Sequence, residues 1–311
     1  MTKDFHRDEN IELNENALQS LYNLSAVCDK ICISGEGDPL ANWQAIPQII
    51  GSNPINVHYE LITSSYWARN KTKSFLQELD LLCSQKKSTL SYRISVDQFH
   101  AEQTERDVLE TLIAIFLSND FKNISLQIRS VTGQEGYLFD RIAKLMNKHF
   151  ISFYFHKIND LESEIITSKF NIKIQFKPTV NPSEFNYIDN WTIDKYIEYI
   201  ERRRGVPFHI GLLNDSLSDP LFDITINPNG DLVLYGAEPF TIGNITKEIF
   251  SCEMIAQKIR MNEDLSELMS YRFVDLIHLW RRNKQRAILI DRINNPFWIV
   301  RNLYKEKLLP K

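Results

Sequence analysis

Strand and helix patterns alternate along the first half of the chain. From Asn14 to Phe150, short runs rich in Ile, Val, Tyr and Phe alternate with stretches in which apolar residues recur three and four positions apart. One strand and helix together take about 30 residues, the length of a βαβ step. The expected strands are residues 30–34, 56–65, 90–97, 123–130 and 149–157, with residues 171–176 as a sixth candidate. This alternation predicts an α/β fold built on a parallel sheet.

The pattern changes after Pro178. Loop-rich segments surround one helical stretch at residues 192–204, and residues 223–236 are typical of a β-hairpin with its turn at Pro228-Asn229-Gly230. Helical patterns fill the remainder of the sequence. We therefore expect two domains: a (β/α) domain over residues 1–180, and a smaller α+β extension with a β-hairpin and helices over residues 181–311.

The composition is that of an ordinary globular protein and argues against several classes of function. A net charge of −4 over 311 residues gives no general attraction to nucleic acid or to anionic membranes. The N-terminus is polar and acidic, unlike a signal peptide, and no apolar run approaches the roughly 20 residues of a membrane span. Four cysteines are too few for a disulfide framework in a chain of this size, so a reducing, cytoplasmic setting is expected.

Residues suited to ligand binding follow the expected strands. In parallel α/β sheets and barrels, ligands bind beyond the carboxyl ends of the strands. The candidate binding residues at these ends are Gly35, Glu36, Gly37, Asp38, Pro39, Thr63, Ser95, Asp97 and Arg129. The glycines allow close approach to the backbone. Asp97 can accept hydrogen bonds from a ribose diol, and Arg129 can pair with a carboxylate. Such a set suits a small zwitterionic ligand that carries a sugar.

Each of these residues also has a purely structural interpretation. The segment from Gly35 to Pro39 can be a tight connection from a strand to a helix. Ser95 and Asp97 can cap the helix that follows them, and Arg129 can form a surface ion pair. The sequence alone leaves both interpretations open.

The motifs, taken in order, resemble those of the radical S-adenosylmethionine (AdoMet) superfamily. The stretch ISGEGDPL at residues 33–40 resembles the Gly-Gly-Glu-Pro motif, which in that family binds the amino group of AdoMet's methionine part. RISVDQFH at residues 93–100 resembles the strand whose Ser-x-Asp-type end lies near the ribose. Thr63 stands where the family often has Thr-Asn-Gly, and Arg129 occupies a carboxylate-binding place.

A second group of motifs resembles the SPASM/Twitch-like extension of the peptide-modifying members. Residues 223–245 contain a strand, a Pro-x-Gly turn, a second strand and then Gly-Asn-Ile. The whole resemblance covers residues 14–245. It implies a partial open (β/α) barrel of radical AdoMet type, AdoMet as a ligand, and a peptide or small molecule as the binding partner.

The sequence departs from the family in its cysteines. Radical AdoMet enzymes hold a [4Fe–4S] cluster with Cys-x3-Cys-x2-Cys after their first strand, and thiolates are the ligands that such clusters require. This chain has no such triplet: Cys28 and Cys32 have no third cysteine near them, so packing roles are expected for them. Gly236 stands where the extension's cysteine is expected. No [4Fe–4S] cluster is therefore expected in the chain as written.

Three hypotheses for function remain. The first is a catalytically silent relative, with no catalytic or metal-binding residues, that binds a peptide, a small molecule or a partner enzyme. The second is a radical AdoMet enzyme whose cluster segment is missing from this sequence, through a misassigned start or a split gene. The third is a metabolic barrel enzyme unrelated to AdoMet.

Overall fold

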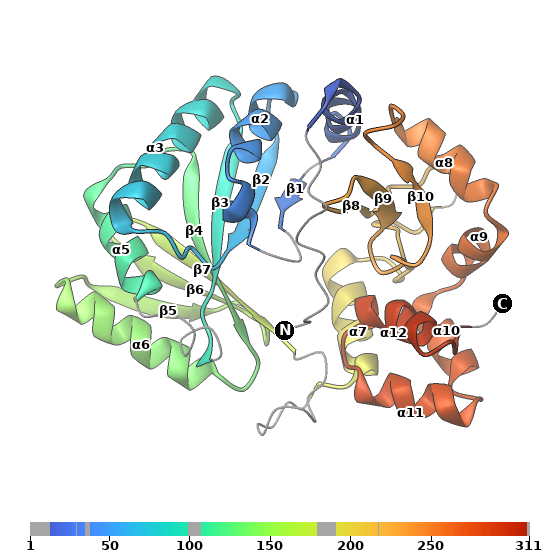
Figure 1. Cartoon of the computed structure of the whole chain (residues 1–311). Helices are drawn as coiled ribbons and strands as arrows, with labels where there is room; N and C mark the ends of the chain where they lie inside the picture. Colours follow the sequence, from blue (N-terminus) through green and yellow to red (C-terminus); the bar gives the residue numbers. More distant parts are fainter. Residues whose placement is uncertain are drawn as a thin grey trace. The chain divides into compact units, whose positions relative to one another are not determined.

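The computed structural model describes residues 13–28, 30–34, 38–98, 107–178, 191–216 and 218–309. The chain divides into two compact units (Figure 1). Unit 1 is Leu24–Lys177. Unit 2 consists, within the described residues, of residues 13–23 together with the chain from residue 178 onward. The domain boundary expected between residues 180 and 181 lies outside the described residues.

Unit 1 is organised around a seven-stranded mixed sheet with the order β1-β2-β3-β4-β7-β6-β5. Its strands are β1 (Lys30–Ile33), β2 (His58–Thr63), β3 (Thr89–Ser95), β4 (Ile124–Val131), β5 (Phe153–Lys157), β6 (Glu162–Thr167) and β7 (Asn171–Lys177). Strands β1, β2, β3, β4 and β7 pair in parallel, so their carboxyl ends lie at one edge of the sheet. The α/β class expected from the sequence is confirmed.

The sequence prediction was wrong about the far side of the sheet. Residues 149–157 are expected as a fifth parallel strand, but β5 lies at the edge and pairs only with β6, antiparallel. Strand β6 was not expected, and the fifth strand to pair in parallel is β7, the sixth candidate. The connections explain the difference. Parallel neighbours need a crossover of a dozen or more residues, whereas only residues 158–161 and 168–170 join these three strands.

Helices of unit 1 cover one face of its sheet (Figure 1). They are α2 (Ala45–Ser52), α3 (Arg69–Gln85), α5 (Val108–Ser118) and α6 (Glu135–Lys148), with a short 3-10 helix η1 at Pro39–Asn42. Strands β1 to β4 follow one another in chain order, and crossovers between parallel strands are right-handed. The crossover helices are therefore all placed on the same face, unlike those of a doubly wound sheet, which cover both faces.

Alternate residues of the strands pack under these helices. The fully or almost fully buried side chains on this face include Tyr59, Leu61, Tyr92, Ile94, Leu126, Ile128, Ile174 and Phe176. Side chains alternate between the two faces of a strand, so the residues between these ones point to the opposite face. None of the four helices covers that second face (Figure 1).

Unit 2 contains a three-stranded antiparallel sheet and several helices. The strands β8 (Ile224–Ile226), β9 (Asp231–Leu234) and β10 (Thr241–Asn244) have the order β10-β9-β8. The helices are α7 (Ile193–Arg204), α8 (Cys252–Arg260), α9 (Glu263–Ser270), α10 (Phe273–Trp280), α11 (Lys284–Arg292) and α12 (Ile299–Lys305), with η3 at Pro296–Trp298. The hairpin predicted at residues 223–236 is confirmed as β8 and β9. Gly230 closes its turn with a φ of 85°, a conformation that favours glycine.

The first helix, α1 (Glu15–Ser25), packs with unit 2 through most of its length. Asn14 and Asn23 donate side-chain hydrogen bonds to the carbonyls of Thr246 (3.0 Å) and Phe250 (3.1 Å). Ser20, which is fully buried, accepts a hydrogen bond from the Phe250 N–H (3.0 Å). These bonds join a helix that precedes β1 in the chain to the segment that follows β10.

No helix within the described ranges is long and apolar enough to cross a membrane.

Candidate functional site

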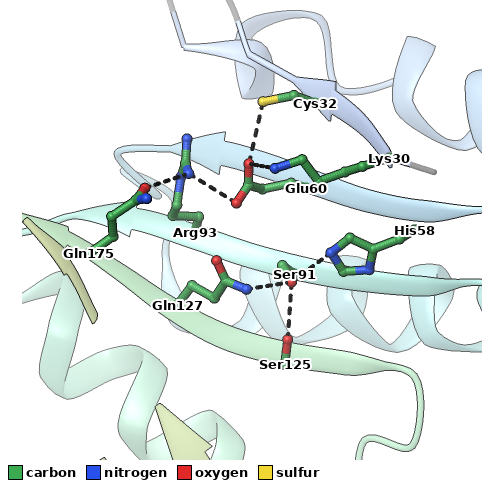
Figure 2. Close-up of polar contacts among 9 residues, drawn as sticks. All are labelled: Lys30, Cys32, His58, Glu60, Ser91, Arg93, Ser125, Gln127 and Gln175. Carbon is green, nitrogen blue, oxygen red and sulfur yellow. Dashed lines mark hydrogen bonds and ion pairs between the residues drawn. The ribbon is translucent and has the colours of Figure 1, made fainter. Parts of the chain in front are cut away.

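The second face of the unit 1 sheet is lined by polar side chains (Figure 2). Strands of parallel sheets that are packed on both faces normally read as continuous apolar runs. Here most residues at alternate positions of the central strands are polar instead, with Ile62 and Val131 as exceptions. The face carries Lys30, Cys32, His58, Glu60, Ser91, Arg93, Ser95, Ser125, Gln127, Arg129, Glu162, Glu164, Lys173, Gln175 and Lys177. We call this set the polar face.

The centre of the polar face is an ion pair between Glu60 and Arg93. Arg93 Nη1 donates to Glu60 Oε1 at 2.9 Å and to Gln175 Oε1 at 3.3 Å (Figure 2). The other carboxylate oxygen of Glu60 accepts from Lys30 Nζ (3.3 Å) and from the thiol of Cys32 (3.6 Å). One carboxylate thus joins β1, β2 and β3, and the guanidinium extends the connection to β7.

These contacts fix the charge states at the centre. Burial alone would raise the pKa of Glu60, but Arg93 and Lys30 together lower it below its ordinary value. The pKa of the Cys32 thiol is raised, by desolvation first and by the Glu60 carboxylate second, although part of the residue is exposed. At neutral pH the centre therefore holds a carboxylate and a protonated thiol, and Cys32 is not poised to act as a thiolate ligand.

A second, neutral group of polar side chains lies beside this centre. Gln127 Nε2 donates to Ser91 Oγ at 2.7 Å, and Ser91 Oγ is also 3.3 Å from Ser125 Oγ and 3.3 Å from His58 Nε2 (Figure 2). Burial, followed by the charge of Lys30, lowers the pKa of His58, so its imidazole is neutral at neutral pH. This group fills the face towards the amino ends of the strands without adding charge.

Arg129 and Lys177 bring positive charge towards the carboxyl ends, and Glu162 of β6, opposite Gln175, brings a carboxylate to the same end. Arg129 lies opposite Gln175 in the register of β4 and β7, and Lys177 lies one position further along the same face, opposite Val131. The pKa of Lys177 is lowered well below its ordinary value, first by burial and then by the guanidinium groups of Arg129 and Arg93. A lysine whose pKa is strongly lowered in this way is a candidate functional residue.

The structure separates the residues that were expected to bind a ligand. Gly35, Glu36 and Gly37 lie outside the described residues. Asp38 has a structural role. Its carboxylate caps η1 at the N–H of Leu40 (2.9 Å) and accepts hydrogen bonds from Thr63 Oγ1 (2.7 and 2.9 Å).

Ser64 is a third hydrogen-bond partner of Asp38. The N–H of Ser64 also donates to Asp38, at 2.7 Å, and the hydroxyl of Ser64 donates to the same carboxylate. Thr63 lies on the helix-covered side of β2, by alternation with Leu61, and Pro39 begins η1. Asp38, Pro39 and Thr63 therefore join the start of η1 to the end of β2 on the helix-covered side of the sheet.

Ser95 and Arg129, by contrast, lie side by side on the polar face. They are opposite one another in the register of β3 and β4, and the N–H of Val96 donates to the Arg129 carbonyl at 2.8 Å. Asp97 follows two residues later and is only 5% exposed. These three residues are the part of the expected set that the fold brings to one place.

Sequence reasoning missed the residues at the centre of the face. Glu60, Arg93 and Lys177 lie within or at the end of strands rather than in the loops beyond them. The signal that could have found them is the recurrence of polar residues two positions apart: His58 and Glu60 in HYELIT, and every second residue in SYRIS and KIQFK. A strand buried on both faces would not carry that pattern.

The cysteines do not form a metal-ligand set. Within the described ranges, no three His, Cys, Asp or Glu side chains come together to hold a metal ion. Cys83 is buried on α3, where burial followed by the charge of Asp80 raises its pKa to about 11. Burial likewise raises the pKa of Cys252. The thiols present do not fit a [4Fe–4S] cluster, which requires closely placed thiolates.

No model of a known protein family and no curated protein matches this chain.

Proposed function

We propose that this protein is a radical-AdoMet-like binding protein without cluster chemistry, and that the polar face of unit 1 is its ligand site. The ligand is a small molecule with an anionic group, of which AdoMet and related adenosyl compounds are examples. The same site would also take the carboxylate of a peptide or an acidic segment of a partner enzyme.

The observation that carries this proposal is the charge on the polar face. Burying charged groups is costly unless they are paired, and proteins keep such groups where they serve a specific purpose. Glu60 and Arg93 are paired, with side chains that are 7% and 8% exposed. Lys177 has no hydrogen bond or ion pair to its ammonium among the residues that the structure describes. An anion on the face would supply the missing partner.

The chain order of the strands supports the partial-barrel part of the proposal. Strands β1 to β4 run in sequence with their crossover helices on one face. A (β/α) barrel has this winding, with its ligand site at the carboxyl ends of the strands. The charged residues Arg129 and Lys177 lie towards those ends.

Roles for individual residues follow from their chemistry. Arg129 would pair with the ligand's carboxylate, since a guanidinium matches that geometry with two hydrogen bonds. Asp97 would accept hydrogen bonds from a ribose diol, and Ser95 would add a hydroxyl beside Arg129. Asp38 would hold the start of η1 to the end of β2 through Thr63 and Ser64. None of these roles includes a redox step, because the donor set does not fit the cluster that AdoMet cleavage uses.

Anaerobic reconstitution tests the absence of cluster chemistry. The 311-residue protein is incubated with iron and sulfide, purified, and then given AdoMet and a strong reductant. We expect no stoichiometric cluster and no 5′-deoxyadenosine above a control without protein. A stoichiometric cluster together with 5′-deoxyadenosine would instead support a radical AdoMet enzyme, and Cys28 and Cys32 would then be the first residues to substitute.

A further inference from the structure

Lys177 ends β7 at the edge of the sheet where the parallel strands have their carboxyl ends. Its register partner is Val131, and Arg129 lies diagonally across on the neighbouring strand, on the same face. Diagonal neighbours of this kind are about 7–8 Å apart at Cα, within reach of long side chains. The amine of Lys177 and the guanidinium of Arg129 can thus both act on a ligand at the same part of the polar face.

Two carboxylates on this face are already engaged. Glu60 accepts from Arg93 at 2.9 Å and from Lys30 at 3.3 Å. Glu162, which lies opposite Gln175 on β6, accepts from Asn159 Nδ2 at 2.9 Å. No side chain in the described ranges forms a hydrogen bond or ion pair with the ammonium of Lys177. The residue as a whole is half-buried.

Burial and the two guanidinium groups favour the neutral form of this amine. Only an unprotonated amine has a free electron pair with which to attack a carbonyl group. Desolvation or a neighbouring cation favours this unprotonated form of a lysine. Lys122 lies outside the polar face, and its side chain is 72% exposed. It therefore serves as the comparison lysine.

We propose that Lys177 is an amine nucleophile that forms an imine with a 2-oxo acid, whose carboxylate is held by Arg129. The nitrogen electron pair adds to the keto carbon, and the resulting carbinolamine loses its hydroxyl group as water. Both hydrogens of the amine end in that water molecule, so no oxidant or reductant is needed. The inference rests on the proposed function only in that the same face receives the ligand.

Borohydride trapping with pyruvate tests this inference. The full-length protein is incubated with pyruvate at neutral pH and reduced with sodium borohydride, which converts an imine to a stable secondary amine. Intact mass and a peptide map then locate the adduct. We expect one adduct per chain, on Lys177, in the wild type and in Lys122→Arg, and a fall to background in Lys177→Arg.

Arg129→Gln separates the role of the carboxylate-binding group. Because a charge-assisted hydrogen bond is lost, the pyruvate concentration for half-maximal trapping should rise about tenfold or more. Circular dichroism of Lys177→Arg and of Lys177→Met verifies that each variant is folded. The peptide map of the wild-type protein identifies the modified residue directly, without the need for a variant.

Adducts spread over exposed lysines, at equal levels in the wild type and in Lys177→Arg, would overturn the inference. An unmodified Lys177 in the wild-type map would do the same. Binding of AdoMet with no trapping of pyruvate would contradict the proposed imine but not the proposed function. Specific trapping at Lys177 with no binding of AdoMet would support the imine and count against AdoMet as the ligand.

Discussion

Arg93 and Glu60 form an ion pair between β3 and β2, with 2.9 Å between Nη1 and Oε1 and with both side chains less than 10% exposed. Glu60 and Arg93 lie on the same face as Lys177, at the centre of the polar face. The predictions below begin with this pair, because the arrangement of the face depends on it.

Removing one partner of the pair should strongly destabilise unit 1. Glu60→Gln or Arg93→Met leaves the other charge buried without its partner, and such losses cost about 3–5 kcal/mol. Replacing both residues together should cost much less than the sum of the two single changes. Urea unfolding of the two single variants and the double variant measures this coupling.

An exposed ion pair provides the control. Lys122 and Asp120 are 72% and 82% exposed, so Lys122→Ala should change the free energy of unfolding by less than about 1 kcal/mol. Equal losses for Lys122→Ala and Arg93→Met would contradict the importance assigned to the buried pair.

Glu60 should also make the stability of unit 1 sensitive to acid. Its folded pKa lies below its ordinary value of 4.5, so its contribution is fully present above that value and is lost as pH falls through the folded pKa. The free energy of unfolding, measured by urea from pH 7 downward, should therefore fall more steeply in the wild type than in Glu60→Gln. Parallel curves for the two proteins would argue against the lowered pKa.

Lys177 should have an effect in the alkaline range. Its folded pKa is lowered, so below the folded pKa the buried ammonium costs stability in full, and the cost shrinks as pH rises towards the ordinary value of 10.5. Lys177→Met removes that cost. The variant's advantage in thermal midpoint over the wild type should be largest below the folded pKa and should vanish near pH 10.5. An advantage that does not change with pH would contradict the environment assigned to this amine.

Asp38 should hold the start of η1 to the end of β2. Asp38→Ala removes the cap at Leu40 and the hydrogen bonds from Thr63 and Ser64, at a cost of about 1–2 kcal/mol in the free energy of unfolding. Asp120→Ala, a change of the same type at an exposed residue, should have almost no effect. A loss of AdoMet binding in Asp38→Ala with unchanged stability would show that Asp38 contacts the ligand instead.

Ser20 should hold α1 to unit 2. Ser20→Ala leaves the N–H of Phe250 without its partner in a buried place, which costs about 1–3 kcal/mol. Gln19→Ala, an exposed change in the same helix, should cost much less. Hydrogen exchange of the Phe250 amide gives a second readout and should become faster only in Ser20→Ala.

The sequence was sufficient for the regular part of unit 1 and insufficient where local signals are weak. The strands that contain Tyr59, Tyr92 and Leu126 were predictable, because helices of ordinary length separate them and alternation marks each one. The pairing direction of β5 was not, since it depends on short turns at residues 158–161 and 168–170. Nor could the contact between Ser20 and Phe250 be read from a sequence separation of 230 residues.

The candidate site divides in the same way. Ser95, Asp97 and Arg129 were found because strand ends are where ligands bind in this class of fold. Glu60 and Arg93 were not found, because their place in the site depends on which face of the sheet the helices leave uncovered.

Titration calorimetry with AdoMet tests the central claim most directly, namely that the polar face binds the carboxylate of a small ligand through Arg129 and its ribose through Asp97. AdoMet is titrated into the wild type, Arg129→Gln, Asp97→Ala and Ser125→Ala, the last being a control on the same face near the amino ends of the strands. The account predicts saturable heat with the wild type and with Ser125→Ala, and an affinity lower by about tenfold or more in the other two variants. No saturable heat with the wild type, or one affinity shared by all four proteins, would contradict it.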